Sequence, residues 1–292
     1  MGVLCMLLWS CTGALIALGG RSLWNPWQFI CVTAMVSGLG QLVYYGVRGQ
    51  LRGCLVMPWR LWALTLLFVT YGLVFPLALM GSVGGQVYEA NLLNYAWPVL
   101  TVVLAVLWVP GTRMTPRLGL AMALAAAGLA LANLDPLWNL LTRGMVRDNP
   151  WPYALAGMAA VLWAAYSALL SRWRSVAGNH ATAPIGFILI GLVSGAVCLA
   201  GREWASPGPM GWVAMLGLSL GPYGAGYLLW ELALHRAPAS VLGLMAASLP
   251  ALSTLLMGAV MRNGFKPHLL VAAGIVSAAV LLGNLSGPKS KC

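Results

Sequence analysis

Ten apolar segments follow one another along the chain, each close to the length that crosses a lipid bilayer. A transmembrane helix needs roughly 20 predominantly apolar residues, and a soluble protein of this size has no core that could bury ten such segments. The segments cover residues 1–20, 28–47, 61–81, 86–108, 116–134, 151–171, 183–201, 210–234, 239–261 and 266–286. The sequence therefore predicts an all-α polytopic membrane protein with ten transmembrane helices.

The composition supports a membrane protein and argues against several other classes. Charged residues make up only 7% of the chain, whereas soluble domains carry roughly 25%. The net charge of +11 is best explained by loops that face anionic lipid headgroups. The six cysteines are scattered and form neither a Cys-x-x-Cys pair nor a Cys/His cluster. We expect contact with membrane lipid, no nucleic-acid partner, no metal and no cofactor.

The positive charges predict how the chain is oriented, because cytoplasmic loops carry an excess of Lys and Arg. With the amino terminus inside, ten of the 16 Lys and Arg residues lie inside. An even number of spans then places both termini in the cytoplasm. The inside residues are Arg48, Arg52, Arg60, Arg113, Arg117, Arg172, Arg174, Arg236, Lys289 and Lys291, and the outside residues are Arg21, Arg143, Arg147, Arg202, Arg262 and Lys266.

The two halves of the chain repeat each other weakly but in a consistent order. The clearest matched pairs are Trp9 with Trp163, Tyr71 with Tyr223 and Pro98 with Pro250. Each half would hold five spans, and an odd number makes the second half enter the membrane from the opposite side. The sequence thus predicts two inverted five-helix repeats, residues 1–134 and 151–292.

Residues 135–150 connect the two predicted repeats. Leu137, Leu140 and Leu141 recur there with helical spacing among polar residues. This pattern favours a short amphipathic helix on the membrane surface.

This arrangement resembles the drug/metabolite transporter superfamily, specifically its EamA-type members. The resemblance rests on a tryptophan in the first span and a proline in the fourth span of each half, and it covers almost the whole chain. Within the family, residues 87–98 (Val-Tyr-Glu-Ala-Asn-Leu-Leu-Asn-Tyr-Ala-Trp-Pro) are most similar to aromatic amino acid exporters. One departure is the end of span four, Trp108–Gly111, where many family members have a glutamate.

The resemblance implies a carrier in a bacterial inner membrane. It would export small organic solutes, foremost aromatic amino acids, by alternating access through a central cavity.

The residues themselves indicate a cavity lined by aromatic groups. Tyr88, Asn91 and Tyr95 share one face of the span 86–108, which is too polar for lipid. Pro98 cannot donate to the carbonyl of Asn94, so this span should bend near its centre. The candidate substrate-binding residues are Trp9, Tyr71, Tyr88, Asn91, Asn94, Tyr95, Pro98, Trp163, Tyr166, Ser167, Tyr223, Tyr227, Pro250 and Ser253.

Each of these residues also has a purely structural explanation. A buried Trp or Tyr at helical spacing is usually packing, and Ser or Thr in a span usually bonds its own helix or a neighbour. Gly217, Gly221, Gly224 and Gly226 surround Pro222 in the span 210–234. They could serve close helix packing or mark a broken helix, and the sequence leaves both readings open.

Alternatives to aromatic amino acid export also stay open. An intramembrane enzyme would need a nucleophile–base pair, metal-ligand spacing or paired carboxylates at depth. The sequence shows none of these, and only Glu89 and Glu231 come near the membrane among its acids, so we expect no enzyme. An EamA-type exporter of another metabolite or drug, or a membrane scaffold that transports nothing, remains possible on the sequence alone.

Overall fold

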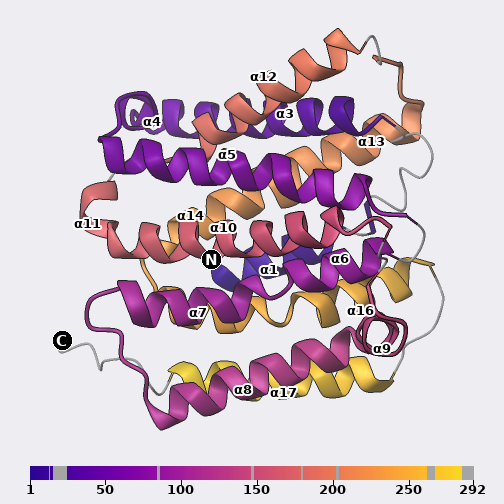
Figure 1. Ribbon diagram of the computed structural model, residues 1–292. Helices are drawn as coiled ribbons and strands as arrows, with labels where there is room; N and C mark the ends of the chain where they lie inside the picture. The colour runs from indigo at the N-terminus through magenta and orange to yellow at the C-terminus, as the bar shows by residue number, and fades with distance from the viewer. Residues whose placement is uncertain are drawn as a thin grey trace.

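The computed structural model describes residues 1–12, 14–15, 25–83, 86–145, 148–178, 180–201, 204–261 and 267–284. The regular secondary structure of these residues is entirely helical. This confirms the predicted all-α class. With the labels of Figure 1, the helices are α1 Gly2–Ser10, α3 Pro26–Val47, α4 Leu51–Leu55, α5 Trp59–Met80, α6 Gln86–Asn94, α7 Trp97–Trp108, α8 Pro116–Ala132, α9 Leu134–Arg143, α10 Trp151–Arg172, α11 Arg174–Ala177, α12 Ala183–Ala200, α13 Pro209–Leu218, the π-helix Ser219–Gly226, α14 Tyr227–Leu234, α15 Ala239–Ala246, α16 Leu249–Met261 and α17 Pro267–Asn284.

Several helices begin at sequence signals that satisfy their free backbone N–H groups. The Asn25 side chain accepts a hydrogen bond from the backbone N–H of Gln28 (3.1 Å) at the start of α3. The Thr115 hydroxyl does the same for the N–H of Leu118 (3.1 Å) at the start of α8. A proline follows each of these caps, where its missing N–H costs no hydrogen bond.

Five helical segments in the described residues are long and apolar enough to cross a membrane. They are Pro26–Val47, Trp59–Met80, Gln86–Trp108, Trp151–Arg172 and Ala183–Ala200. Further apolar helices are shorter, among them Ala239–Ser253 and Leu270–Gly283. The chain is thus built to pass through a membrane several times, while the number of ten spans stays a prediction.

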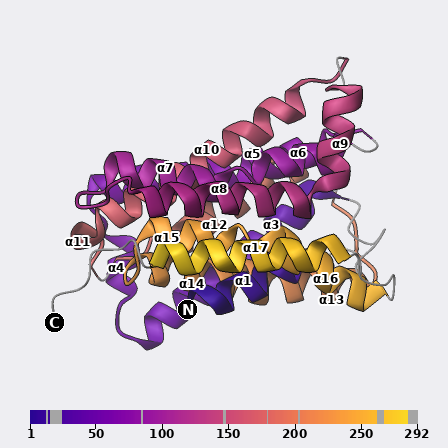
Figure 2. The same cartoon turned by 90° about the horizontal axis from the view of Figure 1, so that it is seen from below.

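The helices pack side by side as a bundle whose long axes run roughly together (Figures 1 and 2). α3 packs along α12, α5 along α10, and α8 along α17. The two ends of the bundle are called here the α9 end and the α11 end, after the short helices that mark them in Figure 1.

α9 occupies the segment that joins the two halves of the chain. It turns away from α8 by 83° and contains no buried residue. Trp138 and Leu141 are exposed on it, although both are large and apolar. A helix of this kind suits the boundary between water and lipid, where one face can lie against headgroups.

Two spans are broken in the same way near their prolines. α6 ends at Asn94 and α7 begins at Trp97, so the regular helix is interrupted for two residues just before Pro98, while residues Gln86–Trp108 still form one span. α15 ends at Ala246 and α16 begins at Leu249, which places Pro250 at the second position of its helix, as Pro98 is in α7.

Part of the evidence for orientation falls outside the described residues. This holds for Arg21, Arg147, Arg202, Arg262, Lys266, Lys289 and Lys291 and for the carboxyl-terminal Cys292.

Candidate functional site

A cavity of about 330 Å³ lies between the helices near the middle of the bundle. Its wall is formed by α1, α5, α6, α7, α10, the π-helix, α14 and α16. Ten predicted site residues line it, namely Trp9, Tyr71, Tyr88, Asn91, Asn94, Tyr95, Trp163, Tyr223, Tyr227 and Ser253. The described residues that line it include no Asp, Glu, Lys, Arg or His, so the cavity is polar only through amides and hydroxyls.

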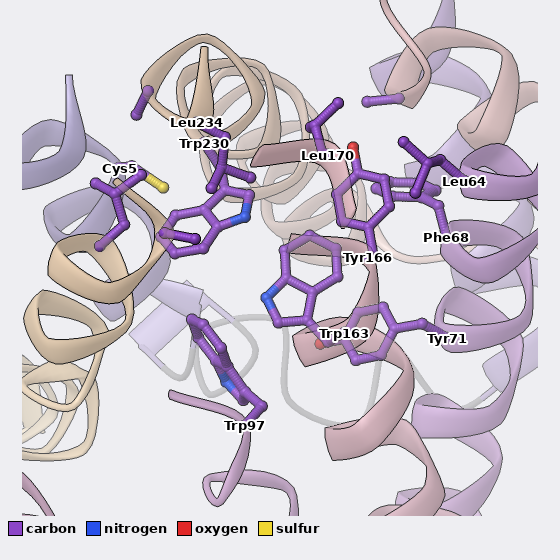
Figure 3. Close-up of a cluster of buried hydrophobic side chains, with 14 of the residues drawn as sticks. Cys5, Leu64, Phe68, Tyr71, Trp97, Trp163, Tyr166, Leu170, Trp230 and Leu234 are labelled. Atoms are coloured by element: carbon purple, nitrogen blue, oxygen red, sulfur yellow. The ribbon is translucent and has the colours of Figure 1, made fainter. Parts of the chain in front are cut away.

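Nine of the nineteen described residues that line the cavity are aromatic. The Trp9 ring lies 5.9 Å from the Trp163 ring and 5.1 Å from the Tyr227 ring, both edge to face. The Tyr71 ring lies 4.8 Å from Trp163 (Figure 3). Rings in this arrangement present both faces and edges, which suits a flat organic molecule with a polar end.

The cavity extends toward the α9 end. Leu79 at the end of α5 and Val87 and Tyr88 at the start of α6 belong to its wall, and Tyr88 is 69% exposed. Trp163 stands at the other limit, where its ring stacks on Tyr166 at 5.1 Å and 22°. Phe68 and Trp230 pack behind these rings and are buried (Figure 3). The cavity is therefore closed on the side of the α11 end by a packed aromatic core.

A hydrogen-bonded network lies beyond this aromatic core. The Glu231 carboxylate accepts hydrogen bonds from the Thr182 backbone N–H (2.6 Å), the Thr182 hydroxyl (2.7 Å) and the Ala183 N–H (3.3 Å). Because the Thr182 hydroxyl donates to Glu231, the Tyr166 hydroxyl donates to Thr182 (2.9 Å). Glu231, which is 1% exposed, thus caps the amino terminus of α12 from a neighbouring helix.

Four predicted site residues lie outside the cavity wall. Tyr166 is occupied by the Thr182 contact, and Ser167 accepts a hydrogen bond from the Trp230 indole N–H (3.2 Å). Both lie about one helical turn beyond Trp163, which puts them behind its ring. Pro98 and Pro250 are buried, and each lies just after the interruption of its span. They shape the cavity through the breaks and do not line it.

The two broken spans approach each other closely. A Cβ atom at Gly243 in α15 would lie 2.7 Å from the carbonyl oxygen of Pro98. Only a glycine therefore permits this contact between α15 and α7, because a backbone oxygen cannot move aside as a side chain can.

The glycine-rich part of the span 210–234 is wound as a π-helix that continues from α13 into α14 without a gap. Its glycines also permit close packing, since a Cβ atom at Gly226 would lie 2.8 Å from the indole nitrogen of Trp9. Four side chains donate to its backbone carbonyls. Trp9 donates to Pro222 (3.0 Å) and Cys5 to Gly226 (3.1 Å) from α1. Ser37 donates to Ser219 (2.8 Å) and Gln41 to Gly224 (2.8 Å) from α3. The irregular backbone is thus satisfied by protein donors and not by lipid.

Several residues of the site were not predicted from the sequence. Trp97, Thr12, Phe75 and Pro222 line the cavity but were not predicted to. Trp97 adjoins the predicted Pro98, and its mid-span position was the available signal. Glu231 was noted only as an acid near the membrane. Its need for a partner in an apolar span could have pointed to a structural cap.

Two further points bear on chemistry. The Glu89 carboxylate in α6 accepts a hydrogen bond from the Tyr153 hydroxyl of α10 (2.5 Å). Among the described residues, no group of three or more His, Cys, Asp or Glu side chains could hold a metal ion.

Comparison with known proteins places these features in context. The chain is 27% identical over 263 residues to the aromatic amino acid exporter YddG of Ancylobacter novellus, a match that covers 88% of this chain and 86% of the relative. A protein of known crystal structure has the same fold, with a TM-score of 0.84 and 22% identity over 100% of this chain and 97% of the other. No family model matches the sequence. The chain is a multi-pass membrane protein similar along most of its length to an exporter, which supports its resemblance to EamA-type transporters.

Proposed function

We propose that this protein is a membrane carrier that exports small organic solutes, foremost aromatic amino acids, by alternating access through the central cavity. The observation that carries the proposal is a cavity whose described wall is rich in aromatic rings, holds no charged side chain and ends at Trp163. Its volume lies at the lower end of the roughly 300–1,000 Å³ typical of small-molecule sites. Similarity to an exporter of aromatic amino acids supports both the solute class and the direction.

We also propose that the ten spans form two inverted five-helix halves. Several features support this architecture. The interruptions α6/α7 and α15/α16 fall at matched places relative to Pro98 and Pro250. Spans two and seven pack together as α3 and α12, and spans five and ten as α8 and α17. A carrier built this way alternates by rocking one helix group against the other around a central site.

The orientation follows from the positive charges. With both termini in the cytoplasm of a bacterial inner-membrane protein, the α9 end faces outward and the described arrangement is open to the outside. Impermeant thiol reagents should then label a cysteine introduced at Asp148 in intact cells. Labelling there only after the membrane is broken would reverse the orientation.

Other solutes remain candidates because the cavity is defined by aromatic faces and uncharged polar groups. A flat drug or another metabolite would meet the same wall. A scaffold that transports nothing has no need of such a cavity, and the described wall offers an enzyme no His, Cys, Asp, Glu, Lys or Arg side chain. Measured flux of a labelled solute into or out of proteoliposomes separates the carrier from both.

Removing aromatic wall residues should weaken solute binding. Trp163→Ala and Tyr95→Ala are each expected to lose on the order of 1 kcal/mol, or several-fold in affinity, because an aromatic contact is lost. Trp138→Ala on exposed α9 is the matched control and should leave affinity unchanged. Competition for flux of labelled Phe and Trp measures the effect. If both cavity variants compete like the parent, the solute does not bind at this wall.

A further inference from the structure

One polar atom in the cavity wall has no partner. Asn94 ends α6, is only 3% exposed and lines the cavity. Its side-chain oxygen Oδ1 is buried and makes no hydrogen bond. Five buried side-chain atoms in the described residues share this condition, and Asn94 Oδ1 alone belongs to a residue of the cavity wall. An unsatisfied buried acceptor is unfavourable, so a solute donor that reaches this oxygen gains by pairing with it.

Asn94 lies at the end of a helix among other cavity-lining residues. Tyr71 and Tyr227 line the same cavity. Immediately after Asn94 the helix is interrupted for two residues, and α7 begins at Trp97. Asn94 therefore stands directly beside the interruption of its span, in a cavity that aromatic residues also line.

The wall around this acceptor is suited to a positively charged donor. An ammonium group offers three N–H donors, and the faces of tryptophan and tyrosine attract cations. Trp97 and Trp163 both line the cavity beside Asn94, and no lysine or arginine in the described wall would repel a cation. A carboxylate, in contrast, carries only acceptors, so it cannot donate a hydrogen bond to Asn94 Oδ1.

We propose that Asn94 Oδ1 is the acceptor for the α-ammonium group of the transported solute and makes the cavity selective for amines. This proposal rests on the proposed function, because it assigns one group of an aromatic amino acid to one atom of the same cavity. The aromatic body then lies against the tryptophan and tyrosine rings. A solute with the same ring but without the amino group gains the ring contacts alone.

The test compares two ligands that differ only in the amino group, L-phenylalanine and 3-phenylpropionate. In the parent protein, L-phenylalanine should bind at least about tenfold more tightly, since a ligand donor satisfies a buried acceptor. Asn94→Leu removes the acceptor at similar size, so it should weaken L-phenylalanine alone and bring the two ligands within about twofold. Asn94→Asp keeps the acceptor and adds negative charge, so it should retain L-phenylalanine and reject 3-phenylpropionate further.

The control is Asn133→Leu, which removes an amide outside the cavity that donates to the Leu129 carbonyl (2.9 Å). It should leave the ratio of the two affinities unchanged. Binding is read from ligand-induced thermal shifts, and competition for labelled L-phenylalanine flux is read in parallel.

An Asn94→Leu protein that weakens both ligands equally, or keeps the parent ratio, would overturn the role of Asn94 while leaving export of aromatic amino acids intact. A parent protein that neither binds nor moves L-phenylalanine would overturn both.

Discussion

Replacing Glu231 with alanine is expected to destabilise the folded protein by on the order of 3 kcal/mol, because three donors lose their acceptor while buried. These donors are the N–H and hydroxyl of Thr182 and the N–H of Ala183, which begin α12. The change also removes the cap of that helix terminus. Thermal unfolding in a fixed detergent measures the loss.

The design of this experiment separates the hydrogen bonds from charge alone. Glu231→Gln keeps one acceptor oxygen and should lose less stability than Glu231→Ala. Asp148→Ala removes an exposed carboxylate and should change stability by less than about 0.5 kcal/mol. Equal midpoints for Glu231→Ala and the parent would show that these hydrogen bonds at the start of α12 do not stabilise the folded protein.

Pro98→Ala and Pro250→Ala are each expected to slow solute flux by about tenfold with little loss of folded protein. Each change restores an N–H that can bond the carbonyl four residues earlier, at Asn94 or Ala246, and so favours a continuous helix across the break. A continuous helix would move Asn94 and Tyr95 away from their places in the wall. An effect of tenfold corresponds to about 1.4 kcal/mol in the limiting step.

The control for the prolines is Pro116→Ala, which lies at the exposed start of α8 and away from the cavity. It should transport like the parent. Initial rates of labelled L-phenylalanine flux, normalised to folded protein from size-exclusion chromatography, give the comparison. Parent rates in both Pro98→Ala and Pro250→Ala would leave the two breaks with no part in the transport cycle.

Helical periodicity predicts part of the candidate site from the sequence, because it shows which residues share one face of a helix. The 3.6-residue period placed Tyr88, Asn91 and Tyr95 on one face, and all three line the cavity. The same reasoning predicted Tyr166 and Ser167 as wall residues, but neither lines the cavity. Residues that share a helix face can still lie at different positions along the bundle axis. Tyr166 and Ser167 lie one turn past Trp163, where Tyr166 stacks on the Trp163 ring and Ser167 accepts a hydrogen bond from the Trp230 indole.

Irregular backbone was harder to predict. The proline rule indicated the interruption near Pro98, since a missing N–H acts within one turn, and the matched Pro250 lies at a similar interruption. The π-helix depends instead on donors from α1 and α3, which lie roughly 180 to 220 positions away in sequence. The cap that Glu231 provides for α12 likewise joins helices that only tertiary packing brings together. Long-range pairs of this kind carry no local signal.

The central claim is that solute passes through the aromatic cavity, and counterflow of labelled L-phenylalanine into preloaded proteoliposomes tests it most directly. Ser253→Trp would fill the cavity from α16, whereas Ser277→Trp adds the same side chain on the exposed face of α17. The parent and Ser277→Trp proteins should both accumulate label faster than empty liposomes, and Ser253→Trp should fall by at least about tenfold. A parent no faster than empty liposomes, or a Ser253→Trp protein as fast as the parent, would contradict the claim.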